Sequence, residues 1–233
     1  MMTSKQIMNK ETAKNLMKKV IKDYSDISED FHKTRKIDWK EFNLYIDYIK
    51  DNTNIADLGC GNGRFYNFIK KQHKKAHYIG IDNNEKLLEK AKETFGEKLF
   101  KLGDLTDIPL ETNSIDVACS IAAFHHIPSL EFKKKSLKEI HRIIKKDGIL
   151  IISVWNLFQE KYKKYIWHSR LKWLLSFEKY DSRDTFIPWG KSGVKRYYHA
   201  FTMRELRKLL KTNGFEIISE HFGRNFTFIC KKS

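Results

Sequence analysis

The glycine-rich stretch "DLGCGNGR", residues 57–64, constrains the fold more than any other part of the chain. It follows "NIADLG" (54–59), a short apolar run typical of a buried strand, and precedes "RFYNFIKK" (64–71), which has helical apolar spacing. Glycines between a strand and a helix allow a tight turn and let a ligand approach where a Cβ would otherwise stand. The stretch therefore predicts a strand–loop–helix unit with a ligand at the start of the helix.

Strand and helix patterns then alternate along the chain. Further strand-like runs occupy residues 76–82, 99–104, 114–124 and 147–155, with helical patterns at 84–95 and 130–144. A helix ending at Gly214 (202–215) is followed by strands at 215–222 and 225–232, and the short Gly223-Arg224 link makes those two strands an antiparallel pair. We predict an α/β fold: a Rossmann-like, doubly wound, seven-stranded sheet with a terminal antiparallel pair at its edge.

The 233 residues suit one domain with an insertion. We predict a helical N-terminal extension (1–50), a ligand-binding core (51–155), an insertion or lid (156–200) and the C-terminal part of the sheet (201–233). The insertion holds 11 aromatic, 10 basic and 4 acidic residues. It is either a cap packed on the sheet or a lid that contacts substrate, and we expect a mixture in which Trp167 and Trp173 pack.

The positive charge of the chain is concentrated near its C-terminus. The net charge is +16, and residues 151–233 carry 17 basic but only 7 acidic residues. Residues 1–150 carry 28 basic and 22 acidic residues, so a uniform compositional bias does not explain the asymmetry. A polyanionic partner such as a nucleic acid is predicted.

The cysteine spacing and the hydropathy indicate the cellular compartment and whether a membrane span is expected. Cys60, Cys119 and Cys230 are scattered without a Cys-x-x-Cys pair, so neither a zinc site nor a disulfide framework is predicted. No window approaches 18 apolar residues, and the charged N-terminus lacks a signal-peptide core. We expect a cytoplasmic protein without a membrane span or a metal.

The spacing of the glycines narrows the ligand. Gly59, Gly61 and Gly63 read G-x-G-x-G, whereas sites for a pyrophosphate use G-x-G-x-x-G. Asp57 stands just before them, where its charge would repel a pyrophosphate and attract an ammonium or sulfonium group.

Two further acids follow neighbouring strands. Asp82 ends the second predicted strand, where a carboxylate can accept from ribose hydroxyls. Asp104 ends the third and is placed to accept from an adenine amino group. A nucleoside with a positive tail and no phosphates is S-adenosylmethionine, which we predict as the cofactor.

This arrangement resembles the class I S-adenosylmethionine-dependent methyltransferases over residues 50–155 and 200–230. Within that class, five blocks in the same order resemble the Trm9-like tRNA wobble-uridine carboxymethyl methyltransferases, also found as a domain of some AlkB-type dioxygenases. The blocks are "YSDISEDFHKTRKIDWKEF" (24–42), "SIAAFHHIPS" (120–129), "ISVWNLFQEK" (152–161), "DTFIPWG" (184–190) and "RYYHAFTMREL" (196–206). The chain departs from the family in its short length and compact insertion.

The resemblance implies a cofactor site, a substrate and a partner. The implied cofactor residues are Asp57, Gly59, Gly61, Gly63, Asp82, Asn83, Asp104, Leu105 and Ala122. The implied substrate is the carboxymethyl group of a modified uridine in the anticodon loop of tRNA, which would become a methyl ester. The resemblance also raises a small zinc-binding adaptor of the Trm112 type as a partner, although the sequence does not show whether one is needed.

A carboxylate acceptor needs positioning rather than a base. Its pKa near 4 leaves it ionised at neutral pH, so the site must hold one oxygen in line with the methyl group. His125 and His126 leave the fourth predicted strand where the sulfonium should lie, and Arg35 offers a charged fork. We predict these three as catalytic residues, the imidazoles acting as donors; one histidine could equally cap the next helix, and Arg35 could pair with a nearby acid.

The substrate contacts are expected from the blocks around residues 155 and 196. Arg196 could bind a carboxylate or phosphate, and Trp155 and Tyr197 could stack on a flipped-out base. His199 completes the predicted substrate set. Core packing is the alternative role for Trp155, and local hydrogen bonding is the alternative for His199.

Other functions compete with this prediction. A small-molecule methyltransferase would leave the basic C-terminal third unexplained. A non-catalytic RNA chaperone that binds S-adenosylmethionine and an enzyme acting on a different wobble carboxylate, such as carboxymethoxyuridine, also stay open.

Overall fold

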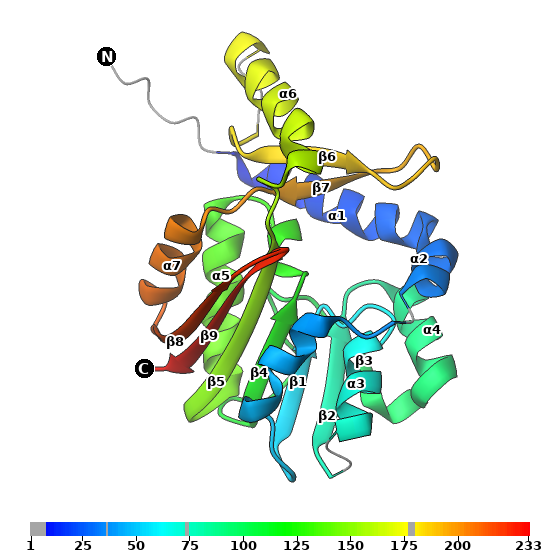
Figure 1. The fold of residues 1–233 in the computed structure, drawn as a ribbon, viewed down its shortest axis with the longest axis vertical. Helices are drawn as coiled ribbons and strands as arrows, with labels where there is room; N and C mark the ends of the chain where they lie inside the picture. The colour runs from blue at the N-terminus through cyan, green and yellow to red at the C-terminus, as the bar shows by residue number, and fades with distance from the viewer. Residues whose placement is uncertain (1–7, 36, 73–74, 177–179) are drawn as a thin grey trace.

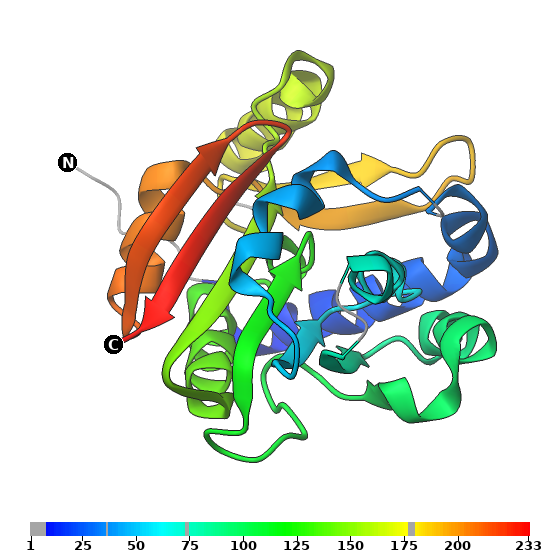
Figure 2. The ribbon, with the colours of Figure 1, turned by 60° about the horizontal axis from the view of Figure 1, so that its bottom comes forward.

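A seven-stranded sheet forms the centre of the protein (Figure 1). The computed structural model describes residues 8–35, 37–72, 75–176 and 180–233. The strand order is β3-β2-β1-β4-β5-β9-β8, in which the first five strands are parallel and β9 runs antiparallel to both neighbours. These strands are β1 (Asn54–Leu58), β2 (His77–Asp82), β3 (Phe100–Leu102), β4 (Ile115–Ile121), β5 (Ile144–Trp155), β8 (Phe215–Phe222) and β9 (Asn225–Lys232). The predicted doubly wound sheet, with β8 and β9 at one edge, is confirmed (Figure 2).

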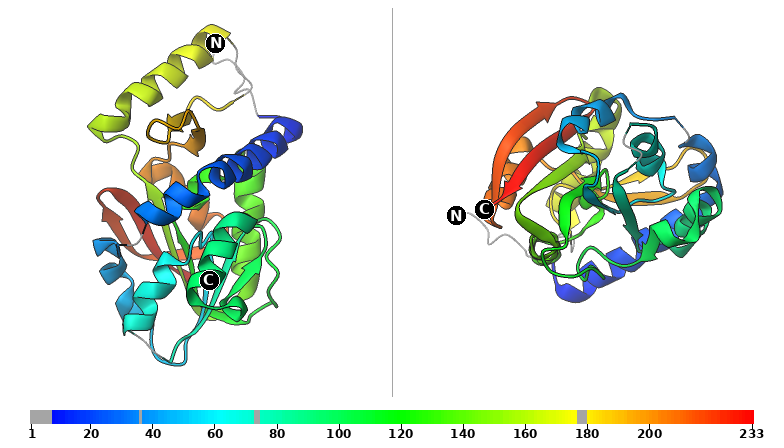
Figure 3. Two further views of the ribbon diagram at one scale, coloured as in Figure 1. Left: turned by 90° about the vertical axis from the view of Figure 1, so that its right-hand side faces the viewer. Right: turned by 90° about the horizontal axis from the view of Figure 1, so that it is seen from below.

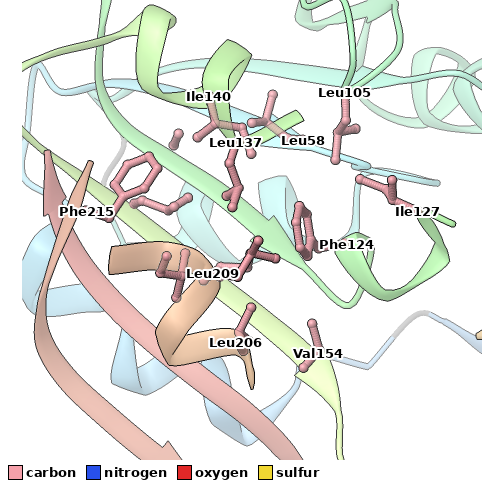
Figure 4. Packing of buried hydrophobic residues seen from close by; sticks show 14 of the residues in the cluster. Leu58, Leu105, Phe124, Ile127, Leu137, Ile140, Val154, Leu206, Leu209 and Phe215 are labelled. Atoms are coloured by element: carbon pink, nitrogen blue, oxygen red, sulfur yellow. The ribbon is translucent and has the colours of Figure 1, made fainter. Parts of the chain in front are cut away.

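Helices cover both faces of the sheet. They are α3 (Arg64–Gln72), α4 (Glu85–Phe95), α5 (Leu130–Ile143) and α7 (Met203–Lys211), with 3-10 turns η1 (Lys40–Leu44), η2 (Ile46–Tyr48), η3 (Glu97–Leu99) and η4 (Phe124–His126). One core cluster joins strand residues to α1, α5 and α7, as Figure 4 shows for Leu137, Leu206 and Leu209. The other joins them to η1 and α3. Within the described ranges, no helix is long and apolar enough to span a membrane.

The N-terminal extension crosses the carboxyl ends of the strands (Figure 1). It consists of α1 (Lys10–Asp26) and α2 (Ser28–Thr34), followed by the η1 and η2 turns. The Asn9 side chain caps α1 by accepting from the Thr12 amide at 2.8 Å. Asn84, after β2, donates to the carbonyl of Ile21 at 2.8 Å, which holds α1 over the sheet.

The insertion forms a helix and a separate strand pair. These are α6 (Glu160–Ser176) and the antiparallel strands β6 (Asp184–Pro188) and β7 (Lys195–His199), which lie beyond the carboxyl ends of the sheet strands (Figure 1). The sequence did not predict the strands. The expectation that Trp167 packs is wrong, because its side chain is 67% exposed.

The segment after β4 differs from its prediction in a way that shapes the site. The sequence predicted a strand to residue 124, but β4 ends at Ile121. Ala122 then takes a positive φ of 54°, and the chain turns into η4. The two histidines therefore sit on a tight turn, with their ring centroids 4.4 Å apart.

Candidate active site

The glycine loop after β1 brings backbone close to its neighbours. Gly59 has φ +81°, and an added Cβ would lie 2.3 Å from the Cβ of Ala123. The Gly61 amide donates to Oδ2 of Asp82 at 2.8 Å, which ties the loop to the end of β2. Gly63 is different: an added Cβ would lie 2.9 Å from the Phe100 ring, so this glycine allows helix packing. The close approach of the loop to its neighbours explains why glycine is required at Gly59 and Gly63.

A pocket lies between this loop and the N-terminal helices. Its walls come from the segments after β1, β2, β3 and β4, from α1 and α2, and from Trp155 and Arg196. Eight of the predicted cofactor residues line it: Asp57, Gly59, Gly61, Asp82, Asn83, Asp104, Leu105 and Ala122. Gly63 is the exception, because it faces the packing interface of α3.

Carboxylates and amides line the end of the pocket next to β2 and β3. The two oxygens of Asp82 accept from the amides of Gly61 and Asn84, at 2.8 and 2.9 Å. Asn83 donates to Oδ2 of Asp104 at 2.8 Å, and Thr106 donates to Oδ1. The Asn83 amide also interacts with Asp82, and because a carboxylate accepts about four hydrogen bonds, Asp82 retains capacity for a ligand hydroxyl.

Asp57 is a buried carboxyl group that forms no ion pair within the described residues, although the charge of Arg64 acts on it. Tyr78 donates to its Oδ2 at 2.8 Å. Burial raises the pKa of Asp57 to about 7, the Tyr78 hydrogen bond lowers it, and the charge of Asp82 raises it. A positively charged ligand near Asp57 would favour its ionised form.

Three arginines also line the pocket: Arg35, Arg64 and Arg196. The guanidinium of Arg64 lies 3.9 Å from the ring centroid of Trp39. Burial and, to a smaller extent, the charge of Arg35 lower the pKa of Arg64 to about 10, against the opposing effect of Asp38 and Asp57. In the part of the chain that the structure describes, none of the three forms an ion pair with a carboxylate, although Asp57, Asp82 and Asp104 line the same pocket.

Arg196 is 4% exposed and lies in a box of aromatic rings. Its guanidinium carbon is 4.6 Å from the ring centroid of Trp189, and 5.2 to 5.6 Å from those of Tyr198, Trp155 and Tyr24. Its Nη1 donates to the hydroxyl of Tyr24 at 3.2 Å, whereas its Nε is buried without a partner among the described residues. A buried donor that makes no hydrogen bond is costly, and a bound anion would reduce that cost.

His126 lines the pocket, but it cannot donate to a substrate as predicted. Its Nδ1 lies 2.7 Å from the carbonyl oxygen of Tyr197, which can only accept, so Nδ1 carries the proton. Its Nε2 therefore accepts from the hydroxyl of Tyr24 at 2.8 Å. Burial lowers the pKa of His126 to about 3, which keeps the ring neutral.

His125 lies outside the pocket lining. It is 1% exposed, stacks on Tyr198 at a centroid distance of 5.0 Å, and accepts from the Trp155 amide through Nδ1 at 3.2 Å. Its burial lowers its pKa well below the usual value. The two rings stay in contact, with centroids 4.4 Å apart, but only His126 lines the pocket, whereas His125 holds the end of β5.

Two predicted substrate residues do not reach the pocket. Tyr197 is completely buried and donates to Asp184 at 2.8 Å. His199 lies between Asp184 and Glu205, with nitrogen–oxygen distances of 2.8 and 3.0 Å. Alternation along β7 turns Arg196 and Tyr198 to one face and these two residues to the other, so their interactions are local.

The pocket residues that the sequence prediction missed include Tyr24, Arg64 and Asn84. Arg64 ends the "GNGR" stretch and could have been found there. Tyr24 begins the first family-like block, but its helical spacing matched ordinary packing. The predicted residues Arg35, Trp155 and Arg196 do line the pocket.

Comparisons with known proteins identify a domain family and solved structures that the chain resembles. Residues 56–152 match the family model described as a methyltransferase domain. A solved S-adenosylmethionine-dependent methyltransferase from Methanosarcina mazei has a TM-score of 0.67 and 22% identity, covering 81% of this chain and 96% of that one. A complex containing the Haloferax volcanii Trm112 methyltransferase activator has a TM-score of 0.62 at 13% identity, covering 91% of this chain and 97% of that one.

Curated relatives carry more specific names. The Schizosaccharomyces pombe protein named tRNA (carboxymethyluridine(34)-5-O)-methyltransferase is 24% identical, with 90% of this chain and 94% of the relative covered. A Xenopus tropicalis protein of the same name is 32% identical over 62% of this chain, which spans only 22% of that longer protein.

The domain match and the fold identify the chain as a class I S-adenosylmethionine-dependent methyltransferase. The predicted class and cofactor are confirmed, and the chain is an enzyme of this class. More particularly, its curated relatives include enzymes named for methylation of carboxymethyluridine in tRNA.

Proposed function

We propose that this enzyme methylates the carboxylate of a carboxymethyl-modified wobble uridine in tRNA, giving the methyl ester. The observation that carries the proposal is the set of pocket arginines, Arg35, Arg64 and Arg196, which have no carboxylate partner in the described ranges. An acceptor that brings its own negative charge would compensate them. The names of the relatives agree with this acceptor.

The residues present fit S-adenosylmethionine. Asp82 has acceptor capacity for ribose hydroxyls, and Asp57 is a buried carboxylate beside the glycine loop that suits an ammonium group. When bound, the cofactor supplies a methyl group on a cationic sulfur, and its transfer to a carboxylate oxygen yields an ester and a thioether. No residue of the chain has to accept a proton in that transfer, because the carboxylate is already ionised.

The arginines divide between two anionic groups in this proposal. The charges of Asp57 and Arg35 both affect the pKa of Arg64, so Arg64 lies near Asp57, at the cofactor end of the pocket. There it would bind the amino-acid carboxylate of the cofactor. Arg196, at the other end, would bind the acceptor carboxylate. Burial lowers the pKa of Arg35, and the positive charge of Arg196 lowers it too.

A tRNA substrate also explains the charge distribution. Residues 151–233 carry 17 basic and 7 acidic residues, and phosphate contacts dominate the affinity of RNA-binding proteins. Trp155 is half-buried at the pocket edge, where a flipped base from the anticodon loop could stack on it. A Trm112-type adaptor and a cytoplasmic location belong to the same proposal, the adaptor supported by the structural similarity to the Haloferax complex.

Nucleoside mass spectrometry of tRNA tests the proposal. A strain that lacks the gene should accumulate carboxymethyluridine and lose its methyl ester, and the wild-type gene should restore the ester. Arg196→Ala should not restore it, whereas a distant surface variant, Lys138→Ala, should. An unchanged nucleoside profile would rule out this function, and loss of a carboxymethoxyuridine ester instead would point to that other wobble base.

A further inference from the structure

Helix α6 presents an exposed apolar stripe. Trp167, Leu171 and Leu174 are 67%, 56% and 67% exposed. They are spaced by four and three residues, so their side chains share one face of the helix. Large apolar side chains that gather on one exposed face commonly mark a binding surface.

The stripe is not needed to hold α6 in place. The opposite face of the helix packs on the strand pair, with Ile166 in a cluster that includes Ile187 and Tyr198. Ser169 adds a hydrogen bond to Thr185 at 3.1 Å. Figure 3 shows α6 on the outer side of β6 and β7, with no other described helix or strand against its other side.

Lysines flank the stripe. Residues 160–176 include five basic residues and one acidic residue, and that acid, Glu160, pairs with Lys163 at 2.6 Å. Lys161, Lys164 and Arg170 form no ion pair with a carboxylate in the described part of the chain. The outer face of α6 therefore combines uncompensated positive charge with an exposed indole.

The helix also begins at the edge of the pocket. Tyr162, in its first turn, stacks on Trp155 with ring centroids 5.8 Å apart and an interplanar angle of 22°. Trp155 itself lines the pocket. A polymeric substrate with one of its units bound in the pocket would therefore have its adjoining units next to α6.

We propose that the outer face of α6 binds the anticodon arm of tRNA, with Lys161, Lys164 and Arg170 on phosphates and Trp167 under an unpaired base. This inference rests on the proposed function and adds the surface that holds the RNA. Charge complementarity favours RNA over a second protein, because the unpaired cations of this face match a phosphate backbone. Exposed aromatic side chains provide stacking platforms for single-stranded bases.

The test compares a double variant on α6 with a matched control. Lys164→Glu with Trp167→Ala removes one cation and the indole, both outside the pocket. Lys138→Glu with Ile218→Ala makes the same kinds of change on α5 and β8, where Lys138 is exposed and Ile218 is 48% exposed. Both proteins, alone and with a Trm112-type adaptor, are titrated with an anticodon stem–loop RNA over a range of salt concentrations.

The α6 variant should bind the stem–loop about tenfold or more weakly, and its log–log salt slope should be shallower by about one. The control should match the wild type. Methylation of free carboxymethyluridine should be unchanged in both, because the pocket is intact. If wild-type enzyme does not methylate that nucleoside or the modified tRNA, the proposed function fails, while the RNA titration still tests α6.

Equal RNA affinity and salt slope in wild type and α6 variant would overturn the inference, as would a wild type that does not bind the stem–loop. Sedimentation measures self-association of the protein, and vesicle flotation measures its binding to anionic lipid. If the variant retains RNA binding but loses self-association or binding to anionic lipid vesicles, the stripe serves that contact instead.

Discussion

The hydroxyl of Tyr24 lies 2.8 Å from Nε2 of His126, and it joins two elements that are 102 residues apart in the sequence. The hydrogen bonds run in one direction: Arg196 donates to Tyr24, Tyr24 donates to His126, and His126 donates to the carbonyl of Tyr197. The chain of bonds fixes the Nη1 side of the guanidinium. The remaining N–H groups of Arg196 are left for an acceptor carboxylate in the proposed reaction.

Tyr24→Phe should therefore lower turnover without weakening cofactor binding. The change keeps the ring but removes the bond that orients Arg196, and a hydrogen bond to a charged group is worth about 1.5–3 kcal/mol, or roughly tenfold or more in rate. Steady-state kinetics and calorimetry measure the two effects. Tyr66→Phe is the matched control, since that hydroxyl makes no hydrogen bond among the described residues; equal losses in both variants would remove Tyr24 from the site.

The chemical step should not depend on the ionisation of His126. Burial holds its pKa at about 3, so the ring is neutral throughout pH 5.5–8.5 and can neither lose a proton nor act as a cation there. Single-turnover rates at saturating cofactor should stay level over this range. A rise with a midpoint near neutrality would mean that a base removes a proton from the acceptor, which a carboxylate does not require.

Cofactor affinity should, by contrast, increase with pH because of Asp57. In the free protein its pKa is about 7, so the carboxyl is mostly protonated at pH 6 and ionised at pH 8. A bound ammonium or sulfonium favours the ionised form, so binding releases a proton at low pH, and affinity rises by at most about tenfold per pH unit until the group is ionised. Calorimetry from pH 6 to 8 measures the trend. Asp57→Asn should flatten it, and an equally steep trend in that variant would assign it to another group.

The neighbouring histidines should respond differently to replacement. His125→Ala leaves a cavity and an unpaired Trp155 amide in the interior, which should cost about 2–4 kcal/mol of unfolding free energy. His126→Ala should reduce turnover more than stability, because its partner Tyr24 belongs to the pocket. Chemical denaturation and turnover on tRNA separate the two; the opposite pattern would exchange the roles assigned here.

Much of the sheet could be predicted because its signals are local. The glycine stretch, Asp82 and Asp104 follow apolar runs whose ends meet at one edge of a parallel sheet, so their positions follow from the pattern alone. The strands β6 and β7 could not be predicted in this way, because they form a separate pair rather than joining the sheet. The exposure of Trp167 could not be predicted from the sequence either, since helical spacing shows which residues share a face but not which face is covered.

The orientation of the site residues depends on contacts distant in sequence. His126 is assigned as an acceptor because its other nitrogen meets the Tyr197 carbonyl, 71 residues away. Ala122 takes a positive φ just after β4, and the turn that follows gives the two histidines different hydrogen-bond partners. Neither fact has a signal in the "FHH" tripeptide itself, so the sequence could place this turn at the pocket but could not assign its donors.

The central claim is that the acceptor is a carboxylate, and the chemical lability of the product tests it most directly. Purified enzyme, with and without a Trm112-type adaptor, is incubated with a methyl-labelled cofactor and tRNA that carries carboxymethyluridine. The account predicts that the label enters the wobble uridine and is released as methanol by mild alkali, as a methyl ester requires, and that Arg196→Ala nearly abolishes it. Label that withstands mild alkali, on a ring atom or a ribose hydroxyl, would contradict the account.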